Sequence, residues 1–203
     1  MKNTLFDSLD FADINEQIHD NPAEYIRVCD REYRSFIKRV ANSIAADDNN
    51  KIVMLSGPSG SGKTTTAHFI EKYINDLGKK AVTVSLDNFY LGKDDLPKLP
   101  DGRFDFETIY ALNIEEMITC LRGLIREGHC NMPEFDFFTG CPKAEKTPLS
   151  LPEDGIAIFE GIHALNSLIL DELPAKNIFK VYVSVKDGIY DGKNLLLSPR
   201  EIR

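Results

Sequence analysis

The feature that most constrains this chain is a glycine-rich turn between an apolar run and the start of a helical pattern. Residues 52–65 have the sequence Ile-Val-Met-Leu-Ser-Gly-Pro-Ser-Gly-Ser-Gly-Lys-Thr-Thr. Gly57, Gly62, Lys63 and Thr64 match G-x-x-x-x-G-K-[ST], the phosphate-binding loop. Glycines let the chain curl so that successive backbone N–H groups face an anion, and the helix N-terminus adds positive charge. The flanking strand and helix patterns are the context that this motif requires, so the sequence predicts a nucleoside triphosphate site.

The residue types in the loop suggest the chemistry of each position. Lys63 places a point charge on the outer phosphates, and the Thr64 hydroxyl is placed for Mg²⁺. We therefore expect Mg²⁺ to accompany the nucleotide. The other residues that we predict to bind the phosphates are Gly57, Ser59, Gly60, Ser61, Gly62 and Thr65.

Composition excludes several other classes of protein. The 24 Lys and Arg residues against 32 Asp and Glu give a net charge of -8, and no basic cluster is present, which argues against nucleic acid or an anionic membrane as the main partner. The four cysteines form no C-x-x-C pair and are interpreted as reduced thiols of a cytoplasmic protein. No stretch approaches the roughly 20 apolar residues of a membrane span.

Residues 1–50 are predicted to be an N-terminal helical extension. Asn21-Pro22-Ala23-Glu24 is a helix start with a capping Asn, a Pro at the first position and a Glu in the third. An apolar stripe at steps of three and four then follows, formed by Cys29, Tyr33, Phe36, Val40 and Ile44. Such a stripe usually packs on its own domain. A docking face for another chain is the less common alternative.

Residues 51–203 alternate strand and helix patterns. Strands are expected at 52–55, 81–86, 156–159 and 179–185, and helices at 66–77, 114–127 and 165–173. Residues 88–112 are irregular, and residues 130–150 predict a β-hairpin flap with a turn at 139–142. The expected fold is α/β, a three-layer P-loop NTPase fold with a mostly parallel central sheet, and ligands at the carboxyl ends of its strands.

Two carboxylates fall at such strand ends. Asp87 follows the second strand directly, where it would accept a proton from an attacking hydroxyl or bind Mg²⁺ through water. Position alone does not separate this role from that of an Asp that turns the chain. Glu160 closes the apolar run 156–159 and fits a carboxylate on the Mg²⁺ side, since four apolar residues before it argue against a solvent-facing acid.

Other candidates are weaker. His163 is interpreted as a hydrogen-bonded or core residue rather than a ligand. Phe104-Asp105-Phe106 and Phe135-Asp136-Phe137-Phe138 would form a slot for a planar ring, with Asp105 on sugar hydroxyls, or a small satellite core under the loops. For Phe106 and Phe138 the satellite core is the preferred interpretation.

Together these segments resemble the uridine kinase and phosphoribulokinase family of P-loop kinases, and uridine kinases most closely. The resemblance spans residues 51–200. Its segments, in order, are Gly57–Thr65, Asp87-Asn88-Phe89-Tyr90, Phe104-Asp105-Phe106, Pro133-Glu134-Phe135-Asp136-Phe137 and Phe159-Glu160-Gly161-Ile162-His163-Ala164-Leu165.

The resemblance implies phosphorylation of the 5′-hydroxyl of a pyrimidine nucleoside, with ATP or another nucleoside triphosphate as donor. It implies Asp87 as general base and Mg²⁺-side ligand, with Thr64 and Glu160 completing the metal environment. Asp105 would bind the ribose hydroxyls. The residues implied to line the nucleoside pocket are Tyr90, Phe104, Phe135 and Phe137. Arg200 and Arg203 would belong to the first helix of the lid and face the phosphates.

Three departures from the family pattern limit this expectation. Gly140 stands where uridine kinases have a His that reads the pyrimidine edge, and Phe135 replaces a Tyr. The chain also stops at Arg203, where the lid begins, so the sequence is either truncated or belongs to a protein without that lid. Two alternatives therefore stay open: a kinase for another hydroxylated metabolite, as in phosphoribulokinases and pantothenate kinases, or a nucleotide-binding regulatory module. The resemblance also makes a homo-oligomer an open expectation.

Overall fold

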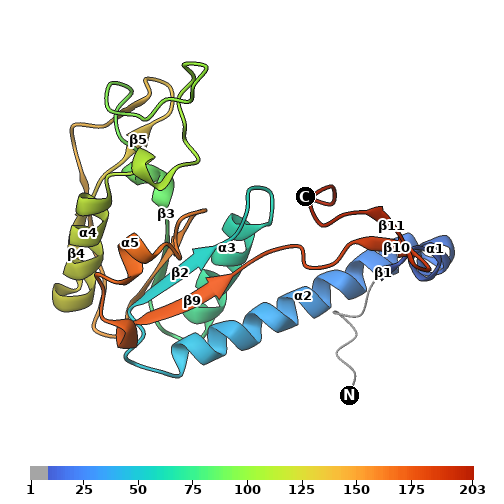
Figure 1. The fold of residues 1–203 in the computed structure, drawn as a ribbon. Coiled ribbons are helices and arrows are strands. Elements are labelled where there is room, and N and C mark those ends of the chain that lie inside the picture. Colours follow the sequence, from blue (N-terminus) through green and yellow to red (C-terminus); the bar gives the residue numbers. More distant parts are fainter. Residues whose placement is uncertain (1–8) are drawn as a thin grey trace.

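The computed structural model describes residues 9–203, and its centre is a parallel β-sheet (Figure 1). Four strands run in the order β3-β8-β2-β9, and all neighbours are parallel. Their bounds are β2 Ile52–Ser56, β3 Ala81–Ser85, β8 Ile156–Glu160 and β9 Ile178–Tyr182. Every residue of β2 and β8 is buried, as expected for central strands of a sheet that is covered on both faces.

Helices cover the two faces and complete three layers. The helices α2 (Pro22–Ala45) and α3 (Lys63–Asp76) lie on one face, where Ile44 and Ile70 pack against the β2 residues Val53 and Leu55. The helices α4 (Ile114–Glu127) and α5 (Ser167–Leu170) lie on the other face, whose core includes Phe159. The alternation of side chains along each strand therefore divides the core into two clusters. The expected three-layer α/β fold is confirmed.

Local capping signals place the helix ends where the sequence predicts them. The Asn21 side chain accepts a hydrogen bond from the backbone N–H of Glu24 at 3.1 Å, and Asn113 accepts one from Glu116 at 3.2 Å. Gly128 follows α4 with a φ of 73°, in the left-handed region that favours glycine.

The flap is an antiparallel hairpin in two parts. The strands β4 (His129–Met132) and β7 (Thr147–Ser150) pair at its base, and β5 (Phe135–Asp136) and β6 (Cys141–Pro142) pair nearer its tip. The tip closes because the Asp136 carboxylate accepts hydrogen bonds from the backbone N–H groups of Phe138 and Thr139.

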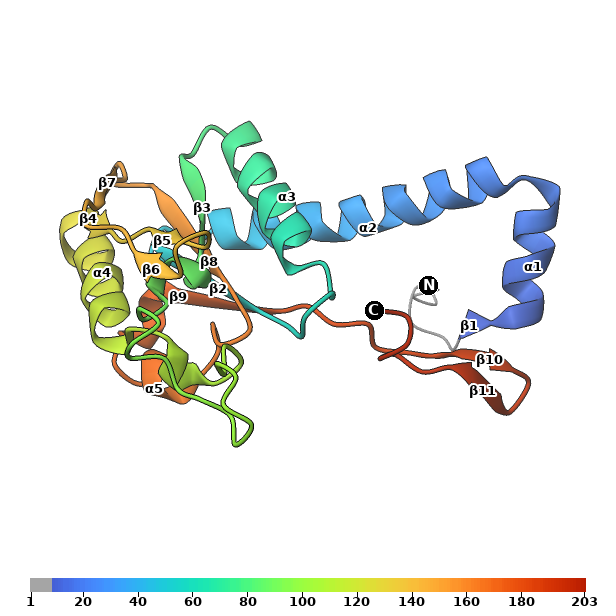
Figure 2. The same cartoon turned by 90° about the horizontal axis from the view of Figure 1, so that it is seen from above.

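The strands at the two ends of the described chain were not predicted, whereas α1 (Phe11–Asp20) agrees with the predicted helical extension. Helix α1 and strand β1 (Leu9–Asp10) lie beside the hairpin of β10 (Ile189–Asp191) and β11 (Asn194–Leu197), at the end of α2 away from the main sheet (Figure 2). This small sheet joins segments about 180 residues apart, so the division of the chain at residue 50 stays a prediction. Residues 1–8 of the predicted extension lie outside the described part.

Several predicted boundaries were wrong. Strand β3 ends at Ser85 because Leu86–Phe89 form a 3₁₀ turn, and α5 has four residues rather than the nine expected at 165–173. Strand β9 ends at Tyr182, where the chain leaves the sheet toward α1. Short 3₁₀ turns also occur at Ile109–Ala111 and Ala175–Asn177.

Among the helices of the part described, none combines the length and the apolar character that crossing a bilayer requires.

We expect α2 to contribute to the stability of the sheet domain. Ile44 of α2 is fully buried, whereas Ile26 on the same helix is 65% exposed. Ile44→Ala should lower the free energy of unfolding by about 2–5 kcal/mol through lost burial and a residual cavity. Ile26→Ala is the matched control, with a change within about 0.5 kcal/mol. Urea unfolding of both variants tests this, and equal stabilities would show that α2 does not share the core.

Candidate active site

The three predicted site segments meet at the carboxyl edge of the sheet. Glu160 at the end of β8 is in register with Leu55 of β2 on one side and with Ser85 of β3 on the other. The phosphate loop follows β2 and Asp87 follows β3, so all three segments leave adjacent strands at the same edge. They enclose a pocket of about 490 Å³ lined by Pro58, Ser59, Lys63, Thr64, Ser85, Asp87, Tyr90, Phe106, Glu107, Glu160, Gly161 and Ile162.

The backbone of the loop has the conformation that a phosphate cradle needs. Gly62 has a φ of 84° at the position that caps α3, a left-handed conformation that other residues rarely adopt. Gly57 lies so close to the carbonyl oxygen of Val183 that any Cβ atom would overlap it. The buried Ser61 hydroxyl has no hydrogen-bond partner within residues 9–203, so it is free to donate to a phosphate oxygen. This loop therefore fits a bound triphosphate.

Lys63 extends along the inside of the loop. Its Nζ donates to the carbonyl oxygen of Pro58 at 3.0 Å and forms no ion pair with a carboxylate of the described chain. A backbone carbonyl is a weak partner for an ammonium group, so the charge of Lys63 remains available to an anionic ligand.

Thr64 and Glu160 form the oxygen-rich part of the pocket. The Thr64 hydroxyl donates to Glu160 Oε1 at 3.1 Å, and Glu160 is only 6% exposed. Oxygen ligands of this kind suit Mg²⁺, which is bound by one or two carboxylates together with phosphate oxygens and water. The described residues contain no cluster of three or more His, Cys, Asp or Glu side chains arranged for a metal ion, so the phosphates would have to supply further ligands.

Asp87 is half-buried beside the phosphate loop. Burial raises the pKa of its carboxyl above the ordinary value of 3.8, and the Tyr90 hydroxyl, Lys63 and His163 partly offset this rise. A carboxylate with a raised pKa is a better proton acceptor than an exposed one. Burial, followed by the neighbouring Asp87 carboxylate, raises the pKa of Tyr90 to about 12, so this phenol stays protonated.

A chain of aromatic rings leads away from Asp87. Tyr90 lies edge-on to Phe106 at 5.2 Å between ring centroids and to Phe135 at 5.6 Å. The chain continues from Phe106 to Phe104 at 6.2 Å and from Phe135 to Phe137 at 5.1 Å. The structure thus brings the four predicted substrate aromatics into one cluster, in which Phe106, expected in a satellite core, joins Phe104 to Tyr90.

The satellite core expected for Phe138 is wrong, whereas Phe106 packs against the rings of Tyr90 and Phe104, as a small aromatic cluster under the loops would. Phe106 lines the pocket, and Phe138 is 98% exposed because it sits at the tip of the flap turn. Asp105 does not line the phosphate pocket, and its carboxylate accepts a hydrogen bond from the backbone N–H of Glu107 at 3.0 Å. Its role toward sugar hydroxyls stays a prediction.

Glu107 and Ser85 line the pocket but were not singled out from the sequence. The Glu107 carbonyl is hydrogen-bonded to His163 Nε2 at 2.9 Å, which ties the long loop to the segment after β8. The expectation that His163 is a hydrogen-bonded residue is confirmed. Ser85 had a detectable signal, since it ends the strand before Asp87, whereas no local pattern marks Glu107.

The two predicted lid arginines are placed differently. The Arg203 backbone lies against Gly60 of the phosphate loop, with its carbonyl oxygen 3.1 Å from where a Cβ would stand on that glycine. Arg200 is exposed. The predicted helix start at 198–203 is a single turn, because the Ser198 N–H and hydroxyl both donate to the Glu201 carboxylate and close it.

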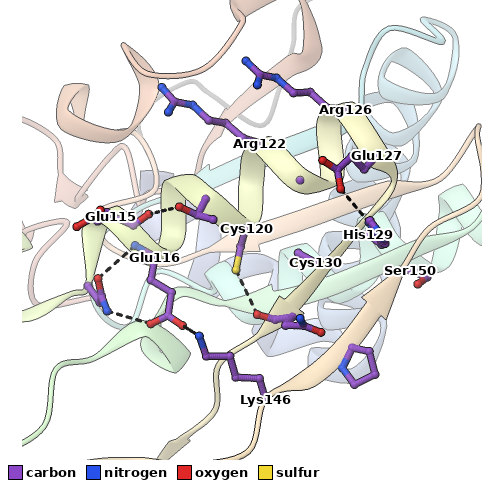
Figure 3. Close-up of a pocket in the computed structure, with 15 residues that line it drawn as sticks. Glu115, Glu116, Cys120, Arg122, Arg126, Glu127, His129, Cys130, Lys146 and Ser150 are labelled. Atoms are coloured by element: carbon purple, nitrogen blue, oxygen red, sulfur yellow. Dashed lines mark hydrogen bonds and ion pairs between the residues drawn. The ribbon is translucent and has the colours of Figure 1, made fainter.

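A larger hollow, of about 820 Å³, lies on another side of the molecule, between α4 and the base of the flap (Figure 3). Glu116 pairs there with Lys146 at 2.6 Å, and the Cys120 thiol donates to the Asn131 carbonyl at 3.4 Å. It contains none of the predicted site residues and is open to solvent. Glu127 also pairs there with His129, and Arg122 is paired with Glu172, which lies outside this hollow.

A strand, a glycine-rich turn and a helix that begins at Lys63, with strand-end carboxylates beside them, define a P-loop phosphate-binding protein. Comparison with known families makes this more specific. Residues 52–190 match the model of the phosphoribulokinase / uridine kinase family, so the chain belongs to this family of P-loop kinases.

Curated relatives agree with this family. The chain is 31% identical over 138 residues to a uridine kinase of Lactobacillus johnsonii, which covers 68% of this chain and 63% of the relative. It is 32% identical over 116 residues to a uridine kinase of Saccharomyces cerevisiae, covering 56% of this chain and 23% of the relative. The chain therefore spans less than two-thirds of the length of these relatives.

A solved structure shares the fold. It is described as a possible uridine kinase from Bacillus stearothermophilus and superposes with a TM-score of 0.59 at 19% sequence identity, covering 74% of this chain and 80% of that one. At this identity the likeness concerns the fold alone.

Proposed function

We propose that this protein transfers a phosphate from ATP to the 5′-hydroxyl of a pyrimidine nucleoside such as uridine or cytidine. The observation that carries the proposal is the placement of Asp87 in the same pocket as Lys63 and the Thr64–Glu160 pair. A proton acceptor thus faces the phosphate loop across a space large enough for an acceptor hydroxyl. Relatives named uridine kinase support the choice of acceptor.

In this mechanism each residue of the pocket has a separate role. The loop N–H groups and the free charge of Lys63 neutralise charge on the phosphates as it spreads in a loose transition state. Asp87 orients the acceptor hydroxyl and takes its proton. Mg²⁺, which Thr64 and Glu160 would bind, supplies further neutralisation of the phosphate oxygens. Tyr90, protonated and hydrogen-bonded to the Phe106 carbonyl at 3.2 Å, fixes the wall beside Asp87.

The charges of the pocket favour an uncharged acceptor. Its charged lining residues are one cation, Lys63, and three carboxylates, of Asp87, Glu107 and Glu160. Lys63 belongs to the phosphate loop, so the acceptor side presents Asp87 and Glu107. A phosphorylated sugar or a carboxylic acid would be repelled there. This favours a nucleoside over the anionic acceptors of a phosphoribulokinase-like or pantothenate kinase-like enzyme.

The pocket is less well equipped to tell one base from another. Gly140 has a φ of 68° in the flap turn and contributes no side chain, and Phe135 offers a ring without a hydroxyl. Recognition of a polar base edge depends on paired polar groups in the site. We therefore propose that the protein discriminates weakly between bases. A cytoplasmic location and a homo-oligomeric assembly are further proposals.

An acceptor panel tests this function. With Mg²⁺-ATP, ADP production should depend on uridine or cytidine and should be at least about tenfold lower with ribulose 5-phosphate or pantothenate, because of the like charges. Glu107→Gln should raise turnover of the anionic acceptors and so lower the ratio of nucleoside to anionic-acceptor turnover. Coupled ADP detection provides the measurement.

Two results would contradict the proposal. Preferred turnover of an anionic acceptor would assign the chain to another branch of its family. Nucleotide binding without ADP production from any acceptor would favour the regulatory module instead.

A further inference from the structure

The helix α2 packs along α3, the helix that starts at the phosphate loop (Figures 1 and 2). The stretch that matches the kinase family begins at residue 52, so α2 lies outside it. The two helices share a buried apolar seam that includes Ile37, Ala41 and Ile70. Close to the loop a side-chain hydrogen bond crosses this seam and joins Tyr33 of α2 to Thr66 of α3.

The direction of this contact follows from proton counting. Thr66 is 2% exposed, and its hydroxyl donates to the carbonyl oxygen of Gly62 at 2.8 Å. The oxygens of Tyr33 and Thr66 are 2.5 Å apart. A carbonyl only accepts, so the single hydroxyl hydrogen of Thr66 is used on Gly62. Tyr33 must therefore donate to Thr66, and the order is Tyr33 hydroxyl, Thr66 hydroxyl, Gly62 carbonyl.

We propose that Tyr33 is a positioning residue for nucleotide binding, acting through Thr66 on the last peptide of the phosphate loop. Gly62 caps α3 in a left-handed conformation, and Lys63 and Thr64 follow it directly. The orientation of the Gly62 peptide sets where these two side chains begin. The inference rests on the nucleotide site proposed above, but it does not depend on the identity of the acceptor.

The Tyr33 ring is itself fixed in place. It lies edge-on to Phe69 of α3 at 6.3 Å between centroids, and the Arg34 guanidinium covers the Phe69 ring at 4.9 Å. Arg34 is in turn paired with Asp30 at 3.0 Å. A ring held on its side leaves the hydroxyl little freedom, so the donor is pre-organised toward Thr66. Removing it leaves a buried hydroxyl oxygen without its donor.

Binding of Mg²⁺-ATP to the full chain, measured by calorimetry without any acceptor, tests the inference. Tyr33→Phe should raise the dissociation constant about three- to tenfold, the range expected for one buried hydrogen bond. Tyr73→Phe is the matched control: Tyr73 stacks on Phe69 at 6.3 Å, and its hydroxyl has no hydrogen-bond partner in the described part of the chain. It should bind nucleotide like the unmodified protein.

Variants of Thr66 test whether Tyr33 acts on the loop through this residue. Thr66→Ser keeps the hydroxyl and should bind nearly normally, whereas Thr66→Val should weaken binding at least as much as Tyr33→Phe. The double variant Tyr33→Phe/Thr66→Val should bind like Thr66→Val alone, because both changes remove the same contact. In steady-state assays the KM for ATP should rise while the KM for the acceptor stays constant.

A purely structural role predicts a different pattern. Tyr33→Phe would then lower the melting temperature but leave the dissociation constant unchanged at a temperature where the protein is folded, and this result would overturn the inference. Additive effects of the Tyr33 and Thr66 changes would do the same. Normal ATP binding without turnover of any nucleoside would contradict only the proposed acceptor, since the ratio of dissociation constants still decides the role of Tyr33.

Discussion

Asp87→Asn should bind Mg²⁺-ATP nearly as tightly as the unmodified protein and lose about 10²- to 10⁴-fold in kcat, the usual contribution of a general base. The structure explains why nucleotide binding and phosphate transfer should respond differently. Asp87 contacts no backbone N–H of the phosphate loop, and its own N–H is hydrogen-bonded to Ser85 Oγ at 3.3 Å, so the exchange of one oxygen for an amide leaves the loop in place. Single-turnover phosphate transfer and nucleotide calorimetry measure the two quantities.

The pH dependence adds a second test of Asp87. Because burial raises the pKa of this carboxyl, the acid limb of kcat/KM should lie above pH 3.8, the ordinary aspartate value, and should disappear in the variant. The raised pKa also means that the folded state holds this proton more tightly than the unfolded state does. The free energy of unfolding therefore falls as pH rises and the Asp87 carboxyl loses its proton. Near pH 7, Asp87→Asn should therefore be at least as stable as the unmodified protein. Any gain in its free energy of unfolding should vanish below about pH 3.8, where the carboxyl is protonated in both the folded and the unfolded state.

The control for Asp87 is Asp154→Asn, an exposed residue of the turn before β8. It should retain full activity. Unchanged transfer in Asp87→Asn would remove this residue from the mechanism and would leave the kinase assignment without its proton acceptor.

Lys63→Met should reduce phosphate transfer by about 10²- to 10³-fold, the loss typical of removing one pre-organised donor from a transition-state site. It should also weaken ATP binding. Lys63 donates only to the Pro58 carbonyl and pairs with no carboxylate in residues 9–203. Its removal therefore leaves no buried charge without a partner. The melting temperature should therefore stay nearly constant while activity falls.

Lys63→Arg is the informative comparison. It keeps the charge but carries a planar guanidinium in place of a compact ammonium group. Partial activity in Lys63→Arg and none in Lys63→Met would show that charge at this position is required and that its placement matters. Full activity in Lys63→Met would contradict a role for the loop lysine in transfer.

Local sequence patterns predicted much of the architecture and the candidate site. The phosphate loop, its strand and its helix are specified within about 25 consecutive residues, and the helix caps at Asn21 and Asn113 act over three residues. Asp87 and Glu160 could be placed near the loop because the carboxyl ends of parallel strands meet at one edge. These inferences need only short-range chemistry and the topology of the fold.

Boundaries and exposed loops were less predictable. The aromatic residues of the flap and long loop share the same composition, yet Phe135 is buried and Phe138 is 98% exposed, since a turn closed by Asp136 directs Phe138 outward. Phe106 became part of the pocket because it packs against Tyr90, which is sixteen residues away in the sequence.

By itself, the sequence determined that the chain has a phosphate-binding loop, strand-end carboxylates and the segments of a P-loop kinase, because each depends on residues that are close neighbours. Tertiary structure decided that Glu107 faces the same pocket as Asp87, that the two ends of the chain pair in a small sheet, and that Tyr33 reaches the loop through Thr66. The Tyr33–Thr66 contact joins residues 33 positions apart, on two helices whose packing no local pattern encodes.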